Sequence, residues 1–127
     1  MELTALVILL ALVQYIWFTI RVGAAREKYG VEAPRTTGDE NWQRIFRVQQ
    51  NTLEQLIVFI PGTLIFGAWF QGPWVLVPGL IFLVGRQLYS MEYVKDPKTR
   101  LPGMSLTFLA NAILLVGIAI GLVLRLI

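Results

Sequence analysis

The sequence predicts an all-α integral membrane protein, a bundle of four transmembrane helices in which residues 1–127 form a single domain. Hydrophobic residues make up 56% of the chain and charged residues only 15%, a low share of charge for a water-soluble domain. The apolar residues gather in four stretches, residues 3–20, 53–70, 74–89 and 106–124. A helix of about 20 mostly apolar residues crosses the hydrocarbon core of a bilayer, so four such helices leave no room for a separate soluble domain.

The first stretch has one alternative interpretation, a secretory signal peptide, because small residues at 23–25 follow it. However, its leading segment carries Glu2 and no Lys or Arg. Its apolar core also exceeds the roughly 7–15 residues typical of signal peptides. We therefore expect the first helix to remain as a membrane span.

The second helix is expected to begin before its apolar stretch, with Asp39 or Asn41 as the N-cap and a kink at Pro61. The third apolar stretch is shorter, and it extends to Tyr93 only if Arg86 faces the protein interior. The first, second and fourth stretches meet the required length once their flanks are counted, and the fourth contains a G-x-x-x-G pair that permits close helix packing.

The basic residues indicate the orientation. They flank the spans on one side at Arg21, Arg26, Lys28, Arg35, Arg44, Arg47, Lys95, Lys98 and Arg100, and on the other only at Arg125. Cytoplasmic loops carry an excess of Lys and Arg, so both large loops are predicted to be cytoplasmic and both termini to lie opposite. The net charge of +3 comes from these flanks and predicts no nucleic-acid partner. Tryptophans 17, 42, 69 and 74 are expected at the membrane interfaces.

The chain contains no cysteine and no histidine. It therefore offers no disulfide, no thiol nucleophile of its own and no His-based catalytic triad. We predict no metal site.

Polar residues interrupt the start of the second span. Arg44, Arg47, Asn51 and Glu54 are spaced by three, four and three residues, which places them along one helical face. An ionised side chain within a membrane span costs roughly 2.5–3.5 kcal/mol or more, so Glu54 needs a partner or a wet cavity. This stripe is either a polar binding site or a structural ion-pair network between helices.

A second polar stripe ends the third span. Arg86, Tyr89 and Tyr93 share a helical face, and Arg100 lies at the approach to the fourth span. Taken alone, the two tyrosines would be interpreted as membrane-interface residues. Arg100 alone would be interpreted as a basic loop residue that sets the orientation of the spans. Together the two stripes predict a pocket for an anionic, polar, peptide-sized ligand at one membrane boundary.

At these residues the chain resembles the membrane-associated proteins of eicosanoid and glutathione metabolism. The segment TTGDENWQRIFRVQQNTLEQL, residues 36–56, is similar to that family's signature of a glycine, a short acidic stretch and E-R-V-F-R-A-Q-x-N-x-x-E. FLVGRQLYSMEY, residues 82–93, is similar to the end of the family's third helix. The resemblance covers essentially the whole chain and implies a homotrimer that binds glutathione between subunits on the cytoplasmic side.

Carried over position by position, the resemblance implies a glutathione transferase acting on hydrophobic electrophiles from the bilayer, with glutathione peroxidase activity as a further expectation. The residues it implies for glutathione binding are Arg26, Arg47, Gln49, Asn51, Glu54, Arg86, Tyr89, Tyr93 and Arg100. Arg100 would also be catalytic, as the cation that supports the glutathione thiolate. The chemistry agrees, since arginine forks suit the two carboxylates of glutathione and a glutamate suits its amino group.

Some positions depart from the leukotriene-synthesising members. Gln55 replaces an aromatic residue, and Glu27 stands where those enzymes have a second arginine, which argues against leukotriene synthesis. Two alternatives remain: a non-enzymatic lipid-binding protein of the same fold, and a four-span multidrug exporter. The exporter is expected to carry its glutamate in the first span, where this chain has only Gln14.

Overall fold

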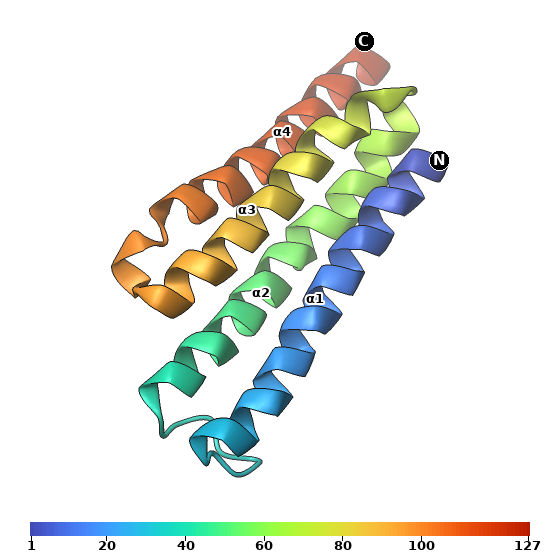
Figure 1. Ribbon diagram of the computed structural model, residues 1–127. Coiled ribbons are helices and arrows are strands. Elements are labelled where there is room, and N and C mark those ends of the chain that lie inside the picture. The colour runs from blue at the N-terminus through green and yellow to red at the C-terminus, as the bar shows by residue number, and fades with distance from the viewer.

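The computed structural model describes residues 1–127 as four long helices joined by short connections. The long helices are α1 (Glu2–Tyr29), α2 (Glu40–Trp69), α3 (Leu76–Lys95) and α4 (Leu101–Leu126), with short 3-10 helices η1 (Pro73–Val75) and η2 (Pro97–Thr99) before α3 and α4. They run up and down in an antiparallel bundle, with both termini at one end and the α1–α2 and α3–α4 connections at the other (Figure 1). Each is long and apolar enough to cross a membrane, as predicted.

Apolar side chains fill the bundle and also cover its outside. At the centre, the rings of Phe59 and Phe82 stack with centroids 3.8 Å apart, beside fully buried Ala11 and Leu114. Large apolar residues are exposed along every long helix, with Ile57 of α2 as much as 69% accessible. An outer surface of this kind suits lipid or another protein chain and not water.

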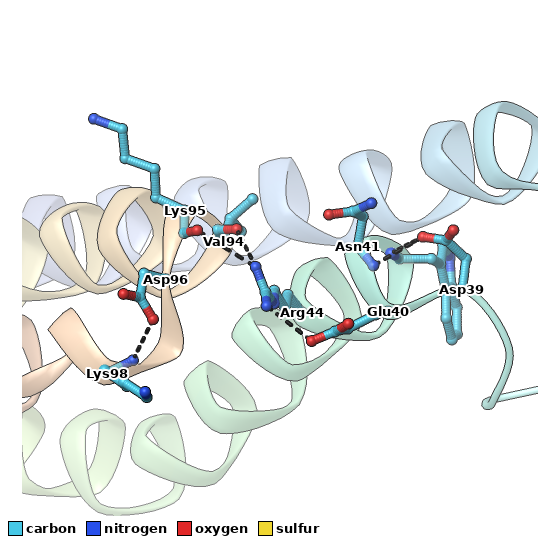
Figure 2. Close-up of polar contacts among 9 residues, drawn as sticks. Asp39, Glu40, Asn41, Arg44, Val94, Lys95, Asp96 and Lys98 are labelled. Carbon is cyan, nitrogen blue, oxygen red and sulfur yellow. Dashed lines mark hydrogen bonds and ion pairs between the residues drawn. The ribbon is translucent and has the colours of Figure 1, made fainter.

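The start of α2 is fixed by an N-cap and by an ion pair in its first turns. Asp39 is the N-cap, and its carboxylate accepts hydrogen bonds from the backbone N–H groups of Asn41 and Trp42 (Figure 2). One turn later, Arg44 forms an ion pair with Glu40 at 2.8 Å. These contacts start α2 well before its apolar stretch, and the helix continues without interruption through Pro61.

The position of Trp42 corrects the expectation that it lies at the membrane interface. Its side chain is completely buried, its indole N–H donates to the carbonyl oxygen of Val22, and the Arg26 guanidinium lies 4.5 Å above its ring. Trp42 therefore joins α1 to α2 as a core residue. Trp17 and Trp74, by contrast, are more than half exposed.

Glycine allows α4 to approach α3 closely where α4 begins. A Cβ atom added to Gly103 would lie 2.6 Å from the Cα atom of Tyr89, too close for any side chain. Gly85 makes a second close approach, because its Cβ would lie 2.9 Å from the Cβ of Leu106. The two glycines bring the start of α4, with Arg100 as its N-cap, against the polar end of α3.

Candidate functional site

The ion pair between Arg47 and Glu54 lies on the outward face of α2. The two side chains are two helical turns apart and meet at 3.5 Å, with about half of each side chain accessible (50% and 56%). Glu54 thus has a partner inside the chain, while the pair as a whole faces away from the bundle. In a membrane this surface needs a further covering, because exposed charge at that depth is unfavourable.

Arg86 is the buried centre of the polar end of the bundle. Only 1% of this residue is accessible, and its guanidinium donates to Thr107 Oγ1 from Nε and to Asn51 Oδ1 and Thr52 Oγ1 from Nη1. It also lies 4.4 Å from the centroid of the Tyr89 ring. The third span was expected to extend to Tyr93 only if Arg86 faced the protein interior. Arg86 does face the interior, and α3 continues to Lys95.

The tyrosines of α3 continue from Arg86 toward the membrane boundary. The Tyr89 ring is buried and stacks on the Tyr93 ring, with centroids 5.3 Å apart and planes tilted by 16°. Arg100 follows on the next helix, where its side chain is exposed and donates to the carbonyl oxygen of Pro97. The close contact of Gly103 with Tyr89 keeps Arg100 near this stack. A cation that takes part in no ion pair thus lies near the stacked tyrosines at the end of α3.

Gln49 and Arg26 lie apart from these groups. Gln49 is two residues before Asn51, which turns it about 200° around the helix. It faces α1, where its amide donates to Thr19 Oγ1 and Tyr15 OH. Arg26 lies on α1 itself, and its Nη1 donates to the carbonyl oxygen of Arg35 at 2.7 Å. Within one chain, the sequence-predicted residues therefore occupy two opposite sides of α2.

Arg44 does not join the stripe that its spacing predicts. Its guanidinium turns to Glu40 and to the backbone carbonyl oxygens of Val94 and Lys95, at 3.5 and 3.4 Å (Figure 2). These contacts connect α2 to the end of α3. Arg44 thus has a structural role, because it joins the start of α2 to the end of α3.

The structure also brings in polar residues that the sequence prediction did not single out for the site. Thr52 and Thr107 bind Arg86, and Asn111 donates from Nδ2 to the side-chain oxygen of Gln55 at 3.1 Å. One signal was available in the sequence, since Thr107 and Asn111 are spaced by four within the most apolar stretch. Polar residues inside a span usually face a partner in the bundle interior.

A multi-pass membrane bundle with a polar, cation-rich site at one boundary is the class that this fold and geometry define. The model of the MAPEG family matches residues 4–120, and the chain belongs to that family. It is 42% identical to an uncharacterized protein from Synechocystis over 113 residues, 89% of this chain and 82% of that protein.

Two further relatives have named activities. The chain is 35% identical to human microsomal glutathione S-transferase 2 over 120 residues, 94% of this chain and 82% of that protein. It is 30% identical to bovine leukotriene C4 synthase over 120 residues, 94% of this chain and 80% of that protein. The family resemblance read from the signature segments is thereby confirmed.

Proposed function

We propose that this protein is a membrane glutathione S-transferase that conjugates hydrophobic electrophiles, with glutathione peroxidase activity as a second reaction of the same site. One observation carries the proposal: the Arg47–Glu54 pair faces outward on the same helix as Asn51, at the polar end of the bundle that also holds Tyr93 of α3 and Arg100 at the start of α4. This set offers cations for two carboxylates and an anion for an ammonium group, which are the charged groups of glutathione. The transferase among the relatives supports the same assignment.

The site is assigned to the interface between neighbouring copies. Arg47, Asn51, Glu54, Arg86, Tyr89, Tyr93 and Arg100 form the half provided by one chain, and Arg26 and Gln49 form the half provided by the next. The opposite placement of Gln49 and Asn51 around α2 supports this division, because one chain cannot direct both side chains at the same ligand. We assign a homotrimer with the α1–α2 and α3–α4 connections in the cytoplasm.

Glutathione supplies the sulfur nucleophile for the reaction. A free thiol has a pKa of about 8.5, and a nearby cation lowers that value, each unit favouring the thiolate by about 1.4 kcal/mol. Arg100 is the cation proposed for this role because its guanidinium is exposed at the start of α4. The remaining residues hold the tripeptide in place, so that an electrophile from the bilayer meets the sulfur in a fixed orientation.

The test is an ultraviolet difference spectrum of the detergent-purified protein with glutathione, followed by conjugation of 1-chloro-2,4-dinitrobenzene. We expect a thiolate band that is lost in Arg100→Ala, with turnover falling more than glutathione affinity. Lys98→Ala is the matched control, because it removes a cation from the same connection. Unchanged turnover in Arg100→Ala would refute the role of Arg100. If the protein bound no glutathione, that result would favour the alternative of a non-enzymatic lipid-binding protein of the same fold.

A further inference from the structure

Arg26 is a cation on the α1 side of α2 that takes part in no ion pair within the chain. Its Nη1 atom donates to the carbonyl oxygens of Arg35 and Val31, at 2.7 and 3.5 Å, and both acceptors are neutral. The charge is therefore available to an anionic ligand. An arginine side chain has several rotatable bonds, and ordering them when a ligand binds weakens the affinity. A protein that fixes the guanidinium beforehand binds its ligand more tightly.

The indole of Trp42 supports this guanidinium. The Cζ atom of Arg26 lies 4.5 Å from the centroid of the ring, a distance at which a cation is attracted to an aromatic face. Trp42 is completely buried, and its Nε1–H donates to the carbonyl oxygen of Val22 at 3.2 Å. The Phe46 ring, one turn further along α2, stacks on the indole with centroids 5.0 Å apart. The indole thus has a fixed position, and it determines where the Arg26 cation lies.

These contacts leave one edge of the Arg26 guanidinium free. Nη1 is engaged by the carbonyl oxygens, whereas Nε and Nη2 donate to no group of the protein. Nε and Nη2 form the edge of an arginine that binds a carboxylate through two parallel hydrogen bonds. Arg47 and Arg100, by comparison, lie over no aromatic ring. Arg26 is therefore held from one side and open on the other.

We propose that Trp42 is a positioning residue for glutathione binding. Its indole holds the Arg26 guanidinium so that the free edge meets a carboxylate of glutathione bound to the neighbouring chain. This inference rests on the proposed function, which assigns Arg26 to the α1 half of the shared site. Trp42 is completely buried, so it acts on the ligand only through Arg26.

The test is a double-mutant cycle between Trp42 and Arg26, with KM and kcat measured for glutathione and 1-chloro-2,4-dinitrobenzene. Trp42→Leu removes the ring and should raise KM about tenfold with kcat nearly unchanged, since Arg100 is untouched. Arg26→Ala should raise KM by at least the same factor. The double variant should have the KM of Arg26→Ala alone, because no guanidinium is left for the indole to hold.

The unfolding midpoint separates this role from simple packing. It should fall when Trp42 is replaced by Leu, whether or not Arg26 is present, because the same space in the core is left unfilled. Trp42→Phe keeps an aromatic face with a weaker attraction for cations, so its KM should lie between those of the wild type and Trp42→Leu. Trp74→Leu is the matched control. Trp74 is 63% exposed at the opposite end of the bundle, and its loss should leave KM unchanged.

The outcomes distinguish this inference from the proposed function. An equal rise in KM on losing Trp42 with and without Arg26 would show that the tryptophan acts through the fold in general, and would overturn the inference. An unchanged KM in Arg26→Ala would overturn it as well but would leave the transferase intact. Failure of the wild-type protein to bind glutathione would instead remove the proposed function, and with it the ligand of Arg26. If Trp42→Leu does not fold, the same cycle with Trp42→Phe decides by the same criterion.

Discussion

Arg86 Nη1 donates a hydrogen bond of 2.7 Å to Asn51 Oδ1, so that a buried cation of α3 sets the orientation of an amide on α2. The carboxamide oxygen is engaged by this bond, and its amino group is left to face away from the guanidinium. Asn51 lies between Arg47 and Glu54 on the same helix. In the proposed glutathione site we therefore assign Arg86 the role of orienting Asn51, because its own side chain is buried.

Replacing Arg86 should therefore affect both stability and glutathione affinity. Arg86→Met leaves Asn51 Oδ1 without its donor, and a polar group left unpaired in this way costs about 1–3 kcal/mol. The hydroxyls of Thr52 and Thr107 also lose the bond from Arg86 but still donate to backbone carbonyl oxygens. We expect a lower unfolding midpoint in detergent and a KM for glutathione that rises about tenfold (about 1.4 kcal/mol), more than kcat falls.

Arg86→Lys separates charge from geometry. A lysine keeps the cation but cannot donate in three fixed directions, so it should restore stability more fully than affinity. The measurements are thermal unfolding followed by tryptophan fluorescence and steady-state kinetics over a range of glutathione concentrations. An unchanged KM in Arg86→Met would show that Asn51 does not depend on Arg86 for its role.

The predicted and observed structures agree where the physical constraint is strong. Apolar length alone predicts the helices. The extension of the third span to Tyr93 required Arg86 to face the interior, and Arg86 is buried there. Spacing also places Arg47 and Glu54 on one face, where they form an ion pair.

The disagreements arise where a side chain has a choice of partners. Arg44 has the spacing of the polar stripe, yet the carbonyl oxygens at the end of α3 and Glu40 hold it elsewhere. Tryptophan is a residue type typical of membrane interfaces, but Trp42 is buried against α1 and the connection between α1 and α2. Tertiary contacts between helices decide such cases, and helical periodicity contains no information about them.

Gly103→Ala should separate α4 from α3. The added methyl group would lie 2.6 Å from Tyr89 Cα, and backbone atoms cannot move aside as a flexible side chain does. We expect a loss of stability of about 1–3 kcal/mol, typical of overpacking, together with weaker thiolate formation because Arg100 moves with the start of α4.

Gly23→Ala is the matched control for this substitution. No heavy atom lies within 4 Å of its added Cβ, so the variant should be stabilised by roughly 0.5–1 kcal/mol through helix propensity. Unfolding midpoints and the thiolate difference spectrum of both variants provide the comparison. Equal stability of the two variants would show that the α3–α4 contact tolerates a side chain at Gly103.

Arg47→Ala and Glu54→Ala should weaken glutathione binding with little effect on folding. An accessible ion pair contributes at most about 1 kcal/mol to stability, so the unfolding midpoint should change only slightly. The affinity for glutathione should fall at least about tenfold in each variant, since each loses one charged partner of the ligand. Glu40→Ala breaks the neighbouring pair with Arg44 and should leave the affinity unchanged.

Co-expression of two inactive variants tests whether the site is shared between chains. Arg26→Ala damages the half on the α1 side of α2, and Glu54→Ala damages the opposite half, so each variant alone should conjugate poorly. In mixed assemblies some interfaces combine an intact half from each variant. Random pairing of equal amounts restores about one quarter of the interfaces of a cyclic oligomer, and activity should recover to that fraction. No recovery, with mixed assemblies confirmed by two different affinity tags, would place both halves of the site within one chain.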